Sequence, residues 1–221
     1  MRSGLLSDPL LRLRRAVAAL ACLGALSSPL AAGEARLQVV GDRLIYDTQV
    51  EVEGELREIE DNDVELIRDL LRDNPGIRVL ELNSTGGGYF AALDIATLAI
   101  DFALDTHVVD ICESACVTIF LGGAQRTMAK GAKLGFHQLT WDSEAAQGFY
   151  EENRERRDWS TPFEFVEWVY EDTQTETYNR LTYMVGRGVD ATFAIQTIRR
   201  PDTGMWYPYR PLLLAAGVLT E

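Results

Sequence analysis

Hydrophobic and polar residues follow two different periods along this chain. Val, Ile and Leu are mixed with polar residues over 37–46, 77–82 and 106–111, which is typical of β-strands. Residues 61–72 carry apolar side chains every three or four positions, and residues 90–104 are apolar on most sides, so both segments are predicted helices. Strands that alternate with helices at this spacing predict an α/β fold with a largely parallel sheet.

The second half of the chain is richer in predicted helix. The polar and aromatic stretch 138–160 predicts a loop with some helix, which would serve as a lid or an interface. Thr161-Pro162-Phe163-Glu164 has the pattern of a capping box and predicts a long helix that ends before Gly186. The other expected elements are short strands at 50–53, 128–129 and 134–136, a short helix at 116–121, a helix that Asp190 caps, and a tail at 205–221 of strand followed by helix that stops at Gly217.

Residues 1–33 are predicted to be a secretory signal. Basic residues come first, an apolar run over 16–26 follows, and small residues at 31–33 suit cleavage after Gly33. A retained membrane anchor is the alternative, whereas Cys22 lacks the preceding residues that a lipoprotein signal needs. Residues 34–221 are then expected to form a single domain in an exported, periplasmic or extracellular protein.

Composition and charge exclude several classes of protein. The chain has 221 residues, of which 47% are hydrophobic, so it can bury a full core and is not disordered. Its formal net charge is −13, which disfavours binding to nucleic acid. Two histidines and three cysteines, without metal-ligand spacing, predict no metal site, and no cofactor is expected.

Three turns carry residues with catalytic chemistry. Residues 83–87 form a glycine-rich turn between a strand and a helix, where Gly86 and Gly87 could aim backbone amides at negative charge. Ser114 lies in a second strand–helix turn, and His137 ends a short strand 23 residues later. A serine needs a base to act as a nucleophile at neutral pH, and imidazole is the usual one. Each motif alone has a structural explanation, such as a helix cap for Ser114.

Together the three motifs resemble those of the Clp protease proteolytic subunit and the wider Clp/crotonase superfamily, over roughly residues 50–140 and 205–221. The resemblance implies a Clp/crotonase-like ββα spiral. It also implies that Ser114 is the nucleophile, that His137 is the base, and that the amides of Gly87 and Ala115 hold the oxyanion. Cysteines on either side of Ser114 are closer to exported Clp-like proteins than to the cytosolic peptidase.

The chain departs from the family pattern at the third catalytic residue. The family's aspartate would fall near Met205, and the nearest carboxylate is Asp202, which could orient His137. A serine–lysine pair is less suited to this chain because its only lysines, Lys130 and Lys133, are close to His137 in sequence.

Cys112 and Cys116 allow two interpretations. In an oxidising compartment they could form a disulfide that stiffens the turn around Ser114, or they could be two small buried hydrophobes.

The sequence therefore predicts an exported serine hydrolase, a peptidase that acts on a peptide or protein substrate. ATP is not available outside the cytoplasm, so no ATPase unfoldase is expected as a partner, and a homo-oligomer is implied by the resemblance alone. The alternatives are a non-catalytic Clp-like protein that binds peptides or assembles with partners, and a crotonase-type enzyme that acts on an acyl-CoA.

Overall fold

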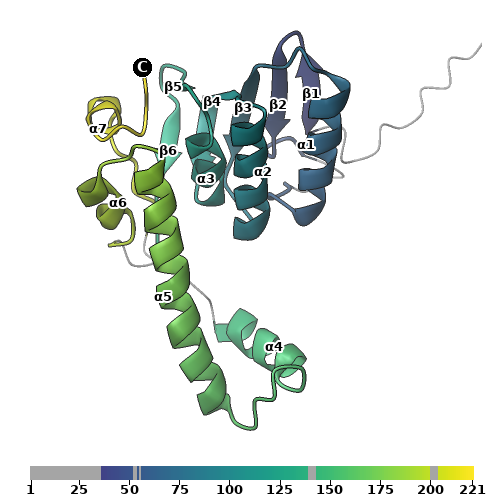
Figure 1. Cartoon of the computed structure of the whole chain (residues 1–221), viewed down its shortest axis with the longest axis vertical. Coiled ribbons are helices and arrows are strands. Elements are labelled where there is room, and N and C mark those ends of the chain that lie inside the picture. Colours follow the sequence, from purple (N-terminus) through teal and green to yellow (C-terminus); the bar gives the residue numbers. More distant parts are fainter. Residues whose placement is uncertain (1–35, 52–53, 55, 139–142, 200–203) are drawn as a thin grey trace, which may run out of the picture.

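The computed structural model describes residues 36–51, 54, 56–138, 143–199 and 204–221. A six-stranded sheet forms the body of the protein, and a long helical arm extends from it (Figure 1). The predicted α/β fold with a largely parallel sheet is confirmed.

Four expectations lie wholly or partly outside the described residues. These are the signal over 1–33, with Cys22, the short strand at 50–53, of which residues 52 and 53 are not described, the stretch 138–160, of which 139–142 are not described, and the candidate catalytic residue Asp202.

The strand order in the sheet is β1-β2-β3-β4-β5, and β6 pairs with β4. Among the strands of the described ranges, β1 and β2 alone pair in antiparallel fashion: the sequence pattern at 37–46 predicts one strand, but Gly41, at a φ of 64°, turns the chain into a hairpin. The other pairs are parallel, since helices or turns return the chain to the same end of the sheet. The strands are β1 (Leu37–Val40), β2 (Arg43–Asp47), β3 (Val79–Ser84), β4 (Asp105–Glu113), β5 (Arg126–Met128) and β6 (Lys133–Gly135).

Three helices lie side by side on one face of the sheet (Figure 1): α1 (Asp61–Asp73), α2 (Tyr89–Asp101) and α3 (Ala115–Leu121). All seven residues of α3 are buried, and α2 buries six, so these two helices form the centre of the core. The helices after the sheet are α4 (Ser143–Asn153), α5 (Pro162–Gly186), α6 (Ala191–Thr197) and α7 (Arg210–Ala215).

A change of register divides β4 into two halves. Leu82 pairs with Val108, but two residues further along β3 Ser84 pairs with Cys112, so β4 contains two extra residues at this point. Asn83 spans the irregularity, because its side-chain oxygen accepts a hydrogen bond from the Ile111 amide at 3.3 Å. The first half of β4 pairs with β5 and the second half with β6. The chain after β4 is thereby brought beside the chain after β6.

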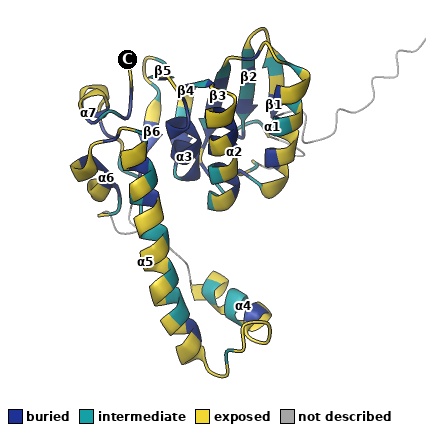
Figure 2. Cartoon of the chain, in the orientation of Figure 1, coloured by how far each residue is buried: buried dark blue, intermediate teal, exposed yellow. Residues whose placement is uncertain are grey.

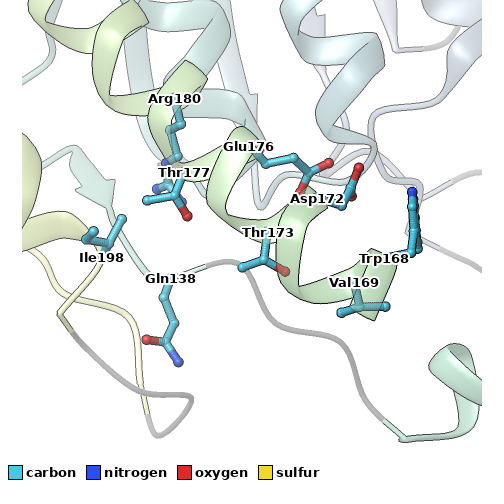
Figure 3. A pocket seen from close by; sticks show the side chains of 9 residues that line it. All are labelled: Gln138, Trp168, Val169, Asp172, Thr173, Glu176, Thr177, Arg180 and Ile198. Carbon is cyan, nitrogen blue, oxygen red and sulfur yellow. The ribbon is translucent and has the colours of Figure 1, made fainter. Parts of the chain in front are cut away.

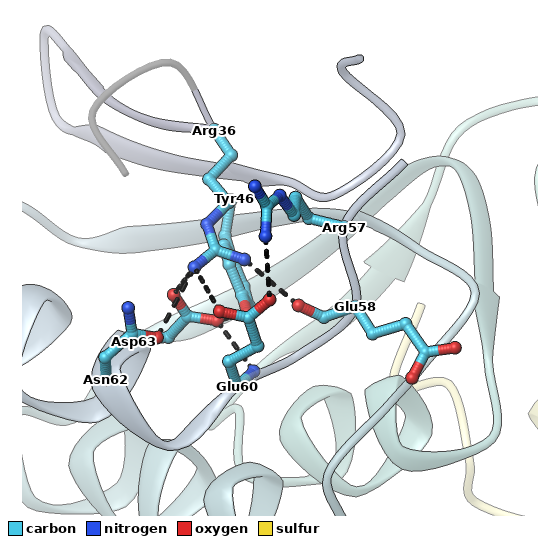
Figure 4. Close-up of polar contacts among 7 residues, drawn as sticks. All are labelled: Arg36, Tyr46, Arg57, Glu58, Glu60, Asn62 and Asp63. Atoms are coloured by element: carbon cyan, nitrogen blue, oxygen red, sulfur yellow. Dashed lines mark hydrogen bonds and ion pairs between the residues drawn. The ribbon is translucent and has the colours of Figure 1, made fainter. Parts of the chain in front are cut away.

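A buried polar network fastens α1 to the first strands (Figure 4). The Tyr46 hydroxyl donates a hydrogen bond to the Asp63 carboxylate, and both side chains are fully buried. The guanidinium of Arg36 forms an ion pair with the same carboxylate. Burial raises the pKa of Asp63, and burial together with the adjacent Asp63 raises the pKa of Tyr46. We assign these groups a structural role, because each is paired with another within the core.

The arm consists of α4 and α5 and extends away from the sheet (Figure 1). The predicted capping box is confirmed: the Thr161 hydroxyl accepts from the Glu164 amide, and the Glu164 carboxylate accepts from the Thr161 amide. Much of the surface of α5 is exposed (Figure 2). None of the helices in the described ranges has both the length and the apolar character that crossing a bilayer requires. The end of the arm is held by stacked and tilted aromatic rings of Phe149, Tyr150, Trp159, Phe165 and Trp168.

The remaining predicted elements are largely confirmed. Asp190 caps α6 through a hydrogen bond from the Phe193 amide, and Gly217 follows α7 at a φ of 69°. The strand expected in the tail is reduced to a single bridge between Trp206 and Phe136, because Pro208 and the start of α7 follow immediately.

Candidate active site

Ser114 lies in a strained turn between β4 and α3. Its backbone has φ 53° and ψ −122°, a conformation that costs a non-glycine residue about 1–3 kcal/mol. The surroundings maintain it: the Ser114 amide donates to the Gly135 carbonyl at 3.0 Å, and its carbonyl accepts from Val117. A serine on a sharp strand-to-helix turn at the end of a parallel strand has its hydroxyl presented at the edge of the sheet.

The glycine-rich turn after β3 packs directly against Ser114. A Cβ atom built on Gly86 would lie 2.8 Å from the Cβ of Ser114 and 3.3 Å from the amide nitrogen of Ala115. A Cβ on Gly87 would lie 2.4 Å from the backbone nitrogen of Ile59. Both glycines have positive φ, 110° and 136°, so glycine is required here for conformation and for space.

Gly87 and Ala115 both lie at this junction, beside Ser114. Gly86 and Gly88 hydrogen-bond Ile59, through a carbonyl and an amide respectively, which leaves the Gly87 amide directed to the opposite edge. Ala115 is the first residue of α3, where a helix amide has no partner within the helix. Gly87, Ala115 and Ser114 line one small cavity of about 30 Å³, which is enough space for a water molecule.

His137 contacts the serine hydroxyl. Its Nε2 lies 2.6 Å from Ser114 Oγ, a hydrogen-bond distance, and both side chains are partly buried. The position follows from the β4–β6 pairing, which aligns Glu113 with Gly135 and so brings the next residues of both chains together. Burial lowers the pKa of His137, the positive charge of Arg180 lowers it further, and a hydrogen bond with the Gln138 backbone raises it. The imidazole is therefore neutral at pH 7 and able to accept a proton.

The position opposite His137 holds a methionine. The bridge between Phe136 and Trp206 is antiparallel, so Met205 lies opposite His137, and a Cβ on Gly135 would approach its Cγ to 2.5 Å. Asp202, the proposed third catalytic residue, lies outside the described residues. The charge of buried Glu113 also raises the pKa of His137, and this carboxylate accepts a hydrogen bond from the Tyr207 hydroxyl. A carboxylate is therefore close to His137 electrostatically, although no hydrogen bond joins the two side chains in the described structure.

Cys112 and Cys116 form a disulfide across this turn, and both residues are fully buried. The bond ties the end of β4 to the first turn of α3, on either side of Ser114.

The two lysines lie apart from Ser114. Lys130 and Lys133 line a cavity of about 570 Å³ beside Tyr207 and Arg210, whereas Ser114 lines a different one. His107 pairs with the Thr127 hydroxyl at 2.8 Å within the sheet, as a structural histidine would. Within the described ranges, no group of three or more His, Cys, Asp or Glu side chains could hold a metal ion.

A larger cavity of about 380 Å³ runs along α5 beside the site (Figure 3). Gln138, which follows His137, lies on one side of it, and Asp172, Glu176 and Arg180 belong to α5. Arg180 also lines the small cavity at Ser114, so this residue borders both. The two cavities are thus adjacent and share Arg180 as a border.

The sequence motifs did not identify Arg180, Glu113 or Tyr89, which all border or influence the site. Glu113 is next to Ser114 in sequence, and Tyr89 directly follows the glycine turn, so proximity was the available signal. Arg180 is 43 residues from His137, and only the path of α5 brings them together.

Comparison with known proteins shows a likeness in structure alone. No family model matches the chain, and no curated protein matches it. Among solved structures, a mutant of ClpP1 from Listeria monocytogenes has 16% sequence identity and a TM-score of 0.48, over 74% of this chain and 85% of that one. A mutant of a membrane-bound stomatin-specific protease in complex with a substrate peptide has 16% identity and a TM-score of 0.48, over 73% and 69% of the two chains.

Proposed function

We propose that this protein is a serine hydrolase, a peptidase that works without ATP. The observation that carries the proposal is the 2.6 Å contact between Ser114 Oγ and His137 Nε2, beside two backbone amides that line the same cavity. A nucleophile, a neutral base and an oxyanion site within one junction are the parts that acyl transfer needs.

The mechanism follows from this geometry. Ser114 Oγ attacks the substrate carbonyl carbon while its proton passes to His137 Nε2. The amides of Gly87 and Ala115 hold the oxyanion, and each such donor contributes about 3–4 kcal/mol in comparable sites. The C–N bond then breaks as His137 returns the proton to the leaving amine. Water, deprotonated by His137, attacks the acyl-enzyme and releases the acid.

In the described structure, two hydrogen bonds fix the orientation of His137. Its ring hydrogen-bonds the Gln138 backbone, and its carbonyl accepts from Arg180 Nη2 at 3.0 Å. Asp202 remains a predicted third member, which the substitution Asp202→Ala tests directly.

Labelling with a fluorophosphonate probe tests the proposal. The purified wild-type chain should react, and Ser114→Ala and His137→Ala should not, with circular dichroism as the check that each variant is folded. Folded wild type that fails to react would contradict the hydrolase proposal. It would favour the non-catalytic alternative, for which the methionine at the position of the family aspartate is the supporting observation.

We also propose that the protein is exported and self-associates. The disulfide supports an oxidising compartment, in agreement with the signal predicted at 1–33. Exposed apolar side chains on α5, including Phe163 at 82% and Tyr170 at 70% exposure, support assembly between copies. Light scattering of the purified chain, compared with Phe163→Ser and Tyr170→Ser together, measures the association. A monomeric wild type would exclude it.

A further inference from the structure

Arg180 carries a buried positive charge that is not paired with any carboxylate of the described residues. The residue is 9% exposed, and its Nη1 is buried without any hydrogen-bond partner in the described structure. Its Nη2 donates to the His137 carbonyl, which is neutral. Buried charges in proteins are normally paired, because an unpaired charge costs several kcal/mol in a low-dielectric interior. No ion pair in the described ranges joins Arg180 to a carboxylate.

The location of this charge points to a ligand. Arg180 borders the small cavity of Ser114 and the larger cavity along α5, so a molecule that fills both must pass its guanidinium. The guanidinium remains protonated although burial lowers its pKa. A planar guanidinium with a free N–H matches a carboxylate.

The hydrogen bond to His137 indicates which part of the substrate Arg180 contacts. In acyl transfer the base returns its proton to the leaving amine, so the leaving group lies on the histidine side of the scissile bond. Arg180 is bonded to the backbone of His137 and therefore lies on that side.

We infer that Arg180 binds a carboxylate in the leaving group of the substrate, directly after the scissile bond. The inference rests on the proposed peptidase function and specifies its substrate class. The carboxylate has two possible sources, the C-terminus of the substrate and an acidic side chain at the first position after the cleaved bond.

Acidic residues on α5 restrict where this carboxylate fits. Glu176 and Asp172 line the same cavity one and two helical turns from Arg180, and they extend away from it (Figure 3). The four residues from Glu176 to Arg180 rise about 6 Å along the helix, which is close to the length of two residues of an extended peptide. An acidic residue two positions further from the scissile bond would therefore approach Glu176. The two negative charges would repel each other, so an acidic residue there would not increase the rate of cleavage.

Matched alanine-rich decapeptides test the inference on the full chain. One series has Glu or Gln at a single scanned position, and the other ends in a free carboxylate or a carboxamide. Mass spectrometry identifies the cleaved bond, and kcat/KM is measured for each pair. We expect the carboxylate member to be cleaved about ten-fold faster or more, which corresponds to about 1.4 kcal/mol. If Arg180 binds an acidic side chain, the Ala–Glu bond should be cleaved preferentially. If it binds the C-terminus, the last residue should be released preferentially from the peptide that ends in a free carboxylate.

Variants assign the preference to Arg180. Arg180→Gln should reduce the Glu/Gln and acid/amide ratios to about one, and Arg180→Lys should retain part of the preference because it keeps the charge. Arg72→Gln removes a charge from the exposed end of α1 and should leave the ratios unchanged. Wild type that labels with fluorophosphonate yet cleaves both members of each pair equally would overturn the inference alone. Wild type that is folded but neither labels nor cleaves would overturn the proposed function and this inference with it.

Discussion

The contact between the glycine turn and the serine turn can be tested with a single methyl group. Gly86→Ala places a Cβ 2.8 Å from the Cβ of Ser114 and 3.0 Å from the Glu113 carbonyl oxygen. Carbon atoms in contact lie about 3.5 Å apart or more, so the two turns must separate by about 0.7 Å. A φ of 110° adds about 1–3 kcal/mol for a residue with a Cβ, and overpacking adds about 1–3 kcal/mol more.

The separation should impair reaction at Ser114 more than it impairs folding. The Ser114–His137 contact of 2.6 Å and the positions of Gly87 and Ala115, whose amides are the proposed oxyanion donors, depend on this junction. A misplacement of about 1 Å in a reactive site can cost about 100-fold in rate. We therefore expect the rate of fluorophosphonate labelling to fall about 10- to 100-fold in Gly86→Ala.

A second glycine provides the control. Gly148 lies in α4, has no atom within 4 Å of its Cβ position, and does not have positive φ. Gly148→Ala should label at the wild-type rate and be slightly more stable, since alanine favours helix. Thermal unfolding of both variants separates loss of labelling from loss of fold. Folded Gly86→Ala that labels as fast as wild type would refute the packing described for this junction.

Three further predictions concern charge and stability. Burial and the charge of Arg180 lower the pKa of His137, and the neutral ring is the proposed base. The labelling rate of the wild type should therefore rise with pH below 6.5 and be level above it, and a midpoint above 6.5 would contradict this. Arg180→Gln should move the midpoint of the pH profile upward. Tyr46→Phe leaves the buried Asp63 carboxylate without its hydroxyl donor, so urea unfolding should show a loss of about 1–3 kcal/mol, and unchanged stability would count against the network. The double substitution Cys112→Ala and Cys116→Ala removes a cross-link over a five-residue loop. Chain entropy predicts that the free energy of unfolding falls by about 2 kcal/mol. A double variant as stable as the wild type would contradict this prediction.

The sheet could be predicted because its strands are buried and local in sequence. Val, Ile and Leu runs between turn residues identified β3 and β4, and the apolar stripe of 61–72 identified α1. The break of register inside β4 could not be predicted, because it depends on the Asn83 side chain bonding a neighbouring strand. That break decides which strand lies beside Ser114.

The proximity of residues that follow a strand end could be predicted from the sequence. The position of a residue on a distant helix could not. Ser114 and His137 both lie at strand ends on one edge of the sheet, where parallel strands bring side chains together. Arg180 is on a mostly exposed helix that mixes apolar and polar residues, and nothing in the neighbouring sequence marks it as buried. Its burial results from the packing of α5 beside His137.

The charge of Arg180 connects the catalytic and binding properties of this site. Burial lowers the pKa of His137 and the charge of Arg180 lowers it further, so the ring is neutral and is also a weaker base. A substrate carboxylate on Arg180 would neutralise the charge and remove this effect. The pKa of His137 would then rise, so the base would strengthen when the preferred substrate is bound. Met205, and not a carboxylate, lies opposite His137. A carboxylate of the bound substrate would therefore supply the negative charge near the base that raises its pKa.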